Sequence, residues 1–335
     1  MDSDRPIDID SLSYRPIRDE SELPWIARLF DIAGWGPVPA ERLGQWFMGG
    51  ELGGSIIMVV ADDKAGEVLG MSVMSPYRVW LMDRVGVACR GRAAVLDPRL
   101  RRLGRGVNDV DETDPLYKLG LVSREIMDER GWEFSYGLPN PKIVKREELR
   151  TIPVEGCESK CELGLGLLID LEQGPPLGSN LEVRTGTEFG PEYDILWERA
   201  KKSLGIECAV LRNAEGLAHA RSNQFRLEFR RPVSEELVGY ATFQNMRNGK
   251  LQDILALDEE AMEQVMRSMV DWLRTYPDAH NMWSLTSTPH PAYRSALEAV
   301  RPSEVDWMFS ISLNTHHDRV GPEFDATKFY VTTGD

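Results

Sequence analysis

The chain has 335 residues, 42% of them hydrophobic and 28% charged, which is enough to form the cores of two domains. Its formal net charge of −15 argues against nucleic acid or an anionic membrane as the main partner, because both would repel it. An acidic balance is compatible with a cationic substrate, and it is also ordinary for cytosolic proteins that have no such substrate.

The cysteines and the N-terminal residues indicate a reducing compartment. Four cysteines are too few and too scattered for a disulfide framework, and Cys157 and Cys161 lack a second ligand pair at zinc-site spacing. Residues 1–10 are acidic and contain no apolar segment of the kind found in signal peptides. No run approaches the roughly 18 apolar residues of a membrane span. The sequence therefore predicts a cytoplasmic protein without a bound metal.

Strands and helices alternate in the first part of the chain. Apolar residues recur at helical spacing after Asp19, and continuous apolar runs of strand length flank the turn at 62–66. The expected elements are a strand at 14–18, a helix at 19–33, a hairpin of strands at 55–61 and 67–74, and one or two strands within 79–95.

A basic loop with two glycines follows the last of these strands. Arg101, Gly104 and Gly106 stand at R-x-x-G-x-G spacing. Glycines let successive backbone N–H groups point into one concavity, which binds phosphate oxygens, and a helix that starts beyond the loop adds positive charge. A basic surface turn is the alternative interpretation.

An acidic segment, 108–114, separates this loop from the next helix, which we expect to begin at Pro115 with Asp114 as its cap. Acidic side chains beside a pyrophosphate would repel it unless they point away. Either the segment covers the site and contacts a cationic substrate, or the module has lost affinity for the phosphate ligand. The remaining elements of this half are a helix to 130, a strand at 132–138, a charged helix to 150, a strand at 163–171 and a linker at 173–180.

The second half repeats this order, which indicates a duplicated fold. Its strand-to-helix junction at 255–261 has acidic residues and no glycine, so it should not bind a pyrophosphate. The expected elements are strands at 181–184, 225–229, 237–243, 251–257, 282–286 and 307–313, and helices at 192–204, 259–274 and 291–300.

The basic loop resembles the acyl-CoA pyrophosphate loop of the GCN5-related N-acetyltransferase (GNAT) superfamily, whose pattern is V-x-P-x-x-R-x-x-G-x-G. Pro98, Arg101, Gly104 and Gly106 stand at that spacing. The segment 132–141 resembles the following family strand, which ends in G-[FL]-P-N-P, and 329–335 resembles the tails of two-module members.

This resemblance implies an α/β (α+β) fold of two tandem modules, each a mixed, mostly antiparallel sheet flanked by helices. Residues 1–172 would be the acyl-CoA-binding module, 173–180 the linker and 181–335 a module without the pyrophosphate loop. Acetyl-CoA would be the co-substrate, and a small amine the acceptor. The cofactor-binding residues that the resemblance implies are Val95, Leu96, Arg101, Arg102, Leu103, Gly104, Arg105, Gly106 and Asn140.

The general acid is the open point of this interpretation. Family members often place a tyrosine in the helix after the asparagine, but no tyrosine stands in 142–148. Tyr136 and Glu147 are the remaining candidates for general acid–base work, although strand alternation could equally bury Tyr136. The resulting hypothesis is an acyl-CoA-dependent N-acyltransferase. The alternatives are a non-catalytic protein that binds acyl-CoA or a partner, and an aminoacyl-tRNA-dependent transferase of the FemABX type, against which the −15 charge counts.

Overall fold

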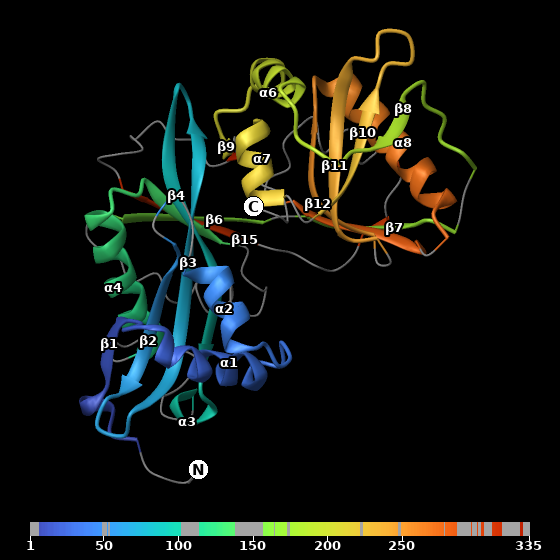
Figure 1. Ribbon diagram of the computed structural model, residues 1–335. Helices are drawn as coiled ribbons and strands as arrows, with labels where there is room; N and C mark the ends of the chain where they lie inside the picture. The colour runs from blue at the N-terminus through green and yellow to red at the C-terminus, as the bar shows by residue number, and fades with distance from the viewer. Residues whose placement is uncertain are drawn as a thin grey trace.

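Two mixed β-sheets with helices on their faces make up the described part of the chain (Figure 1). The computed structural model describes residues 7–48, 52, 54–101, 114–137, 157–163, 165–172, 175–221, 224–246, 249–277, 279–286, 296, 300, 303–304, 310–316 and 329–330.

The elements of the first half begin with two short 3₁₀ turns, η1 (Ile9–Ser11) and η2 (Glu20–Glu22). The helices are α1 (Leu23–Ile32), α2 (Ala40–Phe47), α3 (Pro98–Arg101) and α4 (Pro115–Glu129). The strands are β1 (Ser13–Pro16), β2 (Ile56–Asp62), β3 (Glu67–Leu81), β4 (Arg84–Leu96), β5 (Phe134–Gly137), β6 (Cys157–Leu163) and β7 (Leu165–Asp170).

The second half has three described helices, α6 (Glu192–Ser203), α7 (Ala214–Arg221) and α8 (Glu259–Thr275). Its strands are β8 (Glu182–Thr185), β9 (Cys208–Val210), β10 (Phe225–Arg230), β11 (Leu237–Asn245), β12 (Lys250–Ala256), β13 (Asn281–Thr286), β14 (Ser303–Glu304), β15 (Ser310–His316) and β16 (Phe329–Tyr330).

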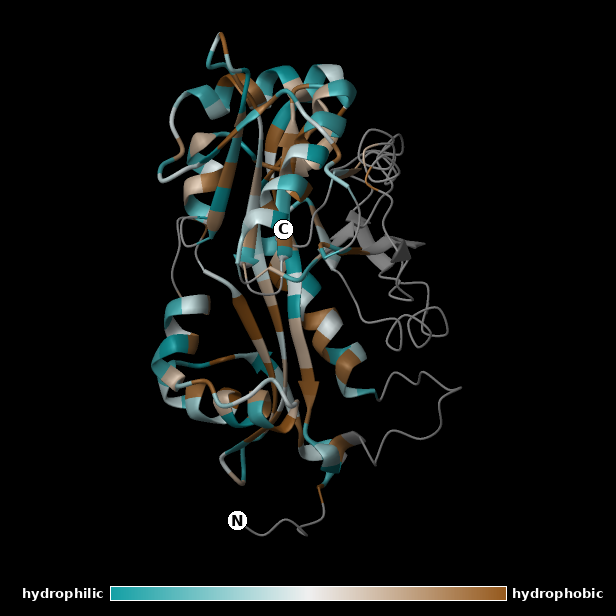
Figure 2. Ribbon diagram, turned by 90° about the vertical axis from the view of Figure 1, so that its right-hand side faces the viewer, coloured by the Kyte–Doolittle hydropathy of each residue, from teal (hydrophilic) through white to brown (hydrophobic). Residues whose placement is uncertain are grey.

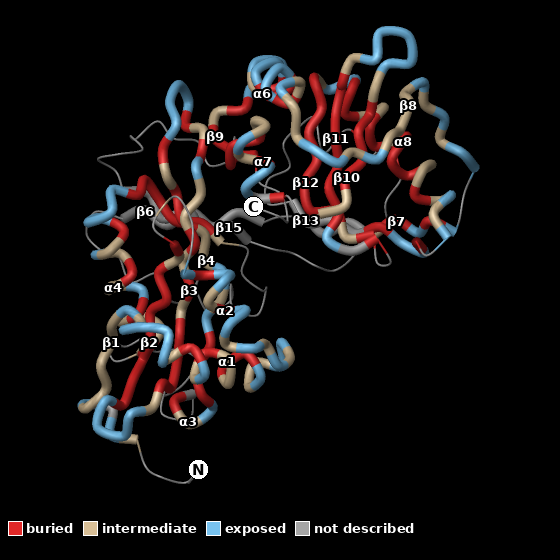
Figure 3. The backbone as a smooth tube through the Cα atoms, viewed as in Figure 1, coloured by how far each residue is buried: buried red, intermediate tan, exposed pale blue. Residues whose placement is uncertain are grey.

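Helices cover both faces of the first sheet. Helices α1 and α2 pack on one face over a core that includes Leu29, Val59 and Val95, while α4 covers the other face with Leu119 and Met127. In Figure 1 the two groups of helices lie on opposite sides of the long β3–β4 hairpin. Both faces of β2 are therefore buried, which explains why this strand is a nearly continuous apolar run. Figure 2 colours the apolar residues of the central strands brown, and Figure 3 colours their buried residues red. The helices that cover them carry exposed residues, pale blue in Figure 3, on their outer sides.

The long helices start where the sequence supplies a capping carboxylate. The Asp114 side chain accepts a hydrogen bond from the Leu116 N–H at 2.8 Å, and Pro115 takes the first helical position of α4. Gly131, with φ +69°, follows the end of that helix in the left-handed conformation that ends helices. Asp258 caps α8 by accepting from the Ala261 N–H at 2.8 Å. Both predicted helix starts are confirmed.

Helix α8 fills the core of the second module. Its predicted apolar stripe of methionines and aliphatic residues is fully buried against the second sheet, as expected for core packing. The residues of the stripe, each 0% exposed, are Met262, Val265, Met266, Met269 and Leu273.

The two sheets have the same topology and exchange one strand each. The first has the order β1–β2–β3–β4–β5–β15–β6, and the second has the order β8–β10–β11–β12–β13–β7–β14. In both sheets the fourth and fifth strands are parallel. The position between the fifth and last strands is filled from the other half of the chain, by β15 in the first sheet and by β7 in the second. The fold is duplicated, and its halves are interlocked by reciprocal strand exchange.

This exchange means that the sheets do not divide at the predicted linker. The sequence analysis expected one strand at 163–171 that closes the first module, whereas the structure has β6 in the first sheet and β7 in the second. Gly164 stands between the two strands, but a glycine within the apolar segment from Leu163 to Ile169 was not a sufficient signal to separate them.

Most other expected elements are present. The α+β class, the tandem arrangement and the strands at 225–229, 237–243 and 251–257 are confirmed. The sequence patterns did not predict helices α2 and α7 or the strands β9, β14 and β16. All five elements are too short to give a periodic signal. The expected helix at 142–150 lies outside the described residues, as does that at 291–300 apart from Ala296 and Val300.

Candidate functional site

The candidate site lies at the carboxyl end of β4 in the first sheet. The described pairs between the parallel strands β4 and β5 run from Cys89↔Ser135 to Gly91↔Gly137, and β4 continues for five more residues to Leu96. A bulge in the β3–β4 pairing between Val73 and Met74 lies at the same level, since their partners are Ala93 and Gly91. Ligands of open sheets bind outside the carboxyl ends of parallel strands, and the end of β4 is such a position.

Val95 and Leu96, predicted to contact a cofactor through their backbones, form the end of β4. Val95 is 4% exposed and packs in the core beneath α1 and α2. Leu96 packs close to Gly70 on β3, where an added Cβ would lie 2.6 Å from the leucine side chain. Both side chains therefore contribute to packing within the first module. The backbone groups of these residues are the atoms that could contact a ligand.

A four-residue ion network fixes the chain where it leaves β4. Asp97 accepts hydrogen bonds from the Arg99 backbone N–H at 2.9 Å and from the Arg99 Nε–H at 3.0 Å. Arg28 of α1 reaches the same carboxylate at 3.3 Å. Glu67, at the start of β3, pairs with Arg99 at 2.5 Å and with Arg28 at 3.0 Å. The first turn of α3 is thus tied to both the sheet and α1.

The charges in this network stabilise the ionised carboxylates. Burial opposes ionisation of Asp97, but hydrogen bonds from Arg99 and the positive charges of Arg99 and Arg28 hold the pKa of this carboxyl below its ordinary value. The pKa of Glu67 is lowered for the same reason, again against the effect of burial. Arg99 therefore serves the structure, and Arg101, the last residue of α3, is the first residue of the predicted R-x-x-G-x-G motif.

The glycine-rich part of the predicted phosphate loop is outside the described residues. Arg101 is described only as the helical end of α3, and Arg102, Leu103, Gly104, Arg105 and Gly106 are not described. Asn140 and Glu147 also lie outside the described residues. Of the acidic segment 108–114, only Asp114 is described, and it caps α4. The cofactor-binding roles stay predictions.

Tyr136, a candidate general acid, lies in an aromatic core. It is 2% exposed, and its ring meets Phe329 of β16 edge-on with centroids 5.2 Å apart. Phe134 of the same strand contacts both rings. Strand alternation thus buries this tyrosine between β5 and the chain's last described strand, as the sequence analysis allowed. The arrangement is suited to packing, and the general acid of the site stays unassigned.

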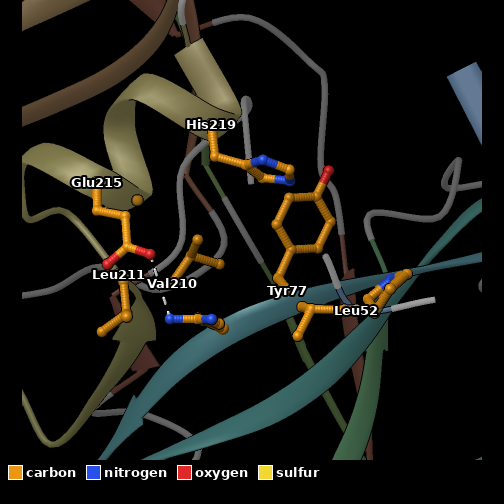
Figure 4. A pocket seen from close by; sticks show the side chains of 9 residues that line it. Leu52, Tyr77, Val210, Leu211, Glu215 and His219 are labelled. Carbon is orange, nitrogen blue, oxygen red and sulfur yellow. Dashed lines mark hydrogen bonds and ion pairs between the residues drawn. The ribbon is translucent and has the colours of Figure 1, made fainter. Parts of the chain in front are cut away.

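Two strands from the second half of the chain, β9 and β16, join the first sheet beside this site. Strand β3 is much longer than β2, so its end pairs on that side with β9, from Val79↔Val210 to Leu81↔Cys208. Strand β16 pairs in turn with β9. A pocket lies at this junction, lined from β3 by Tyr77 and from α7 by Glu215 and His219 (Figure 4). The sequence patterns did not predict that these three residues line one pocket, because they are far apart in the chain.

Two further properties hold for the described part of the chain. No group of three or more His, Cys, Asp or Glu side chains among the described residues could hold a metal ion. No described helix is long and apolar enough to cross a membrane.

Comparison with solved structures identifies the fold. A GCN5-related N-acetyltransferase from Kribbella flavida matches with a TM-score of 0.57 and 14% identity, over 92% of this chain and 72% of that chain. One from Sphaerobacter thermophilus matches with a TM-score of 0.53 and 16% identity, over 95% and 98%. Saccharomyces cerevisiae N-myristoyltransferase with bound myristoyl-CoA matches with a TM-score of 0.59 and 10% identity, over 93% and 81%.

No family model and no curated protein matches the sequence itself. At these identities the similarity is one of fold, and it extends over both halves of the chain. The chain has the GNAT fold in two tandem modules.

Proposed function

We propose that the protein is an acyl-CoA-dependent N-acyltransferase that transfers an acetyl group to the amine of a small molecule. The observation that carries the proposal is the end of β4. This strand continues beyond Gly91, its last described pair with β5, to Leu96, and turns through the anchored Asp97 into α3, directly before the R-x-x-G-x-G loop. In this proposal β4 and β5 separate beyond Gly91 and form an opening for the co-substrate. Solved proteins with the same fold include acetyltransferases and a myristoyl-CoA-bound transferase.

In this proposal the backbone of Val95 and Leu96 binds the pantetheine arm, which lies in the opening between β4 and β5. Arg101 to Gly106 hold the pyrophosphate, and Asn140 makes a further contact with the co-substrate. The ion network of Asp97 supports these roles, because it fixes the direction in which the chain enters the loop. Glycine-rich backbone and arginine are a combination that binds phosphate oxygens well.

The chemistry needs no covalent nucleophile. The acceptor nitrogen attacks the thioester carbonyl carbon, the C–S bond breaks, the coenzyme thiolate leaves, and the proton lost by the nitrogen passes to a base or to solvent. The protein's contribution is to orient the two reactants and to polarise the carbonyl with backbone N–H groups. A small amine, with a cationic metabolite as the class that fits the acidic surface, is the proposed acceptor in a cytoplasmic setting.

The burial of Tyr136 favours one alternative, a non-catalytic protein that binds acyl-CoA or a partner. In that case acetyl-CoA binds but no coenzyme is released when amines are added. A FemABX-type transferase has weaker support, since it requires a basic tRNA-binding face on a chain with a net charge of −15.

The test is calorimetric titration with acetyl-CoA of the parent, of Gly104→Glu and of Gly120→Glu. Gly120 lies on α4 with no atom within 4 Å of an added Cβ, so the same substitution there is a matched control. We expect binding in the parent and in Gly120→Glu, and none in Gly104→Glu. Release of free coenzyme with amines then separates the transferase from the non-catalytic protein. A parent that does not bind acetyl-CoA, or a Gly104→Glu variant that binds it normally, would refute the proposal.

A further inference from the structure

A pocket at the junction of the two modules lies beside the proposed opening of the first sheet (Figure 4). Its walls are mainly apolar and are formed by Pro76 and Tyr77 of β3, by Val210 of β9 and the adjoining Leu211, and by Leu52. Glu215 and His219 of α7 stand at its polar side, and in Figure 4 the Tyr77 ring points toward the imidazole. Neither module alone forms this pocket.

Backbone pairing holds the two walls at a fixed distance. The Leu211 N–H donates to the Arg78 carbonyl at 3.0 Å, directly beyond the last β3–β9 register pair, Val79↔Val210. An ion pair between Arg78 and Glu215 at 3.4 Å ties α7 to β3 beside the pocket. The side chains of this pair are 43% and 64% exposed, so the ion pair contributes little to stability, and a ligand group could replace either partner.

The pocket lies near the place where the proposed function puts the reacting nitrogen. Tyr77 lies opposite Ala88 on β4, three residues before Gly91, the last residue of β4 with a described partner on β5. At about 3.3 Å per residue, the pocket is about 10 Å from that point along the strand. Arg92, the residue after Gly91, has its guanidinium 5.2 Å from the centre of the Tyr77 ring, so both side chains project from the same face. One extended molecule can therefore reach both places.

The lining defines the chemical class of that molecule. A half-buried tyrosine ring between Pro76 and Val210 offers a flat apolar surface, on which aromatic and aliphatic groups pack favourably. The site at the β4 opening, by contrast, must accommodate only the reacting nitrogen and the acyl group.

We propose that this pocket binds the non-reacting end of an elongated acceptor amine, an apolar or ring-bearing group that packs on Tyr77 while the nitrogen lies at the opening between β4 and β5. The inference rests on the proposed transferase function and adds the class of acceptor. The second module then supplies half of the acceptor site, through β9 and α7, although it has no pyrophosphate loop of its own.

The test measures binding of two amines to the full chain by calorimetry, without acetyl-CoA. The probes are 4-phenylbutylamine, whose ring is four carbons from the nitrogen, and propylamine, which lacks the ring. We expect 4-phenylbutylamine to bind the parent about tenfold or more tightly than propylamine, since burying the ring on an aromatic wall should contribute this much.

Two variants test the location of the ring. Tyr77→Ala removes the wall, and His219→Trp fills the pocket from an exposed position on α7 where the fold tolerates a large side chain. Both should abolish the advantage of the ring-bearing amine. Tyr117→Ala is the matched control, because Tyr117 is also half-buried but lies on α4, on the opposite face of the sheet.

The outcomes separate the pocket from the transferase function. Equal affinity for the two amines in the parent, or an advantage that survives in both Tyr77→Ala and His219→Trp, would overturn the inference. If acetyl-CoA does not bind but the ring-bearing amine shows the expected pattern, the pocket is an amine site and the transferase proposal fails. If both hold, Tyr77→Ala should raise the KM for the amine and leave the KM for acetyl-CoA unchanged.

Discussion

The ion network around Asp97 makes a prediction that concerns both stability and cofactor affinity. In Asp97→Asn, the side-chain oxygen can still accept the hydrogen bond from the Arg99 N–H. The amide NH2 that replaces Oδ2 cannot accept the hydrogen bonds from Arg99 and Arg28, so the substitution removes the charge and these two bonds. Asp97 is 2% exposed and contacts two arginines, and a hydrogen bond to a charged group contributes about 1.5–3 kcal/mol.

The expected loss is at the lower end of that range. Glu67 still pairs with both arginines in the variant, and the side chains of Arg99 and Arg28 are 18% and 34% exposed, so solvent compensates part of the lost charge. We expect the free energy of unfolding to fall by about 2 kcal/mol and Tm by about 4 °C, and acetyl-CoA to bind several-fold more weakly. Asp31→Asn, an exposed position on α1, is the matched control and should change neither.

The pH dependence distinguishes loss of charge from a general packing defect. Because the folded pKa of Asp97 lies below its ordinary value, its stabilising contribution is fully present above about pH 4 and is lost as the pH falls through the folded pKa. Thermal unfolding of parent and variant should therefore give different Tm values at pH 7 and converging values near pH 3. A Tm difference of the same size at both pH values would refute this assignment, as would unchanged stability at pH 7.

Two further predictions follow from the packing of the second module and the strand exchange. Met266→Ala, at a 0% exposed position of α8, should lower the free energy of unfolding by about 2–5 kcal/mol in denaturant titration. Glu263→Ala, on the outer face of the same helix, should lower it by less than about 0.5 kcal/mol. Equal effects would place the methionine stripe outside the core. The fragments 1–172 and 181–335 should each fail to give a cooperative unfolding transition alone and should associate when co-expressed. The reason is that the first fragment lacks β15 of its own sheet, and the second lacks β7. A cooperative, monomeric 1–172 fragment would contradict the exchange.

Local signals made much of the fold predictable. The capping carboxylate of Asp114 marked one helix start, and helical spacing of apolar residues marked the helix that begins at Glu259. Apolar runs marked the buried strands on either side of Gly66. The repeated order of elements indicated the duplication. In each of these cases, the signal and the structure it specifies lie within a few residues of one another.

The strand exchange and the pocket could not be predicted in this way. The pairing of β15 with β5 and β6 joins residues more than a hundred positions apart, and β7 shows the same apolar pattern whichever sheet receives it. Tyr77 and His219 belong to one pocket only because β9 pairs with the end of β3. The predicted pyrophosphate loop is the reverse case, since its motif is local and can be read from the sequence, while its glycines lie outside the described residues and its role stays a prediction.

The two copies of the module differ at one equivalent junction, and the difference agrees with the proposal that only the first copy binds a pyrophosphate. Each copy's fourth strand is followed by an aspartate that caps the next helix, Asp97 in the first and Asp258 in the second. Asp258 leads at once into the long α8, where its carboxylate occupies the Ala261 N–H and two glutamates fill the first turn. An anion would meet both repulsion and an occupied donor there.

In the first copy, α3 is only one turn long, and Arg28 and Arg99 neutralise the aspartate, so the chain reaches the basic loop without a competing negative charge. The second copy is nevertheless required by the first. It supplies β15 to the first sheet, Phe329 to the core around Tyr136, and β9 and α7 to the pocket. A module that has no phosphate loop thus remains necessary, because the neighbouring site is built partly from its strands.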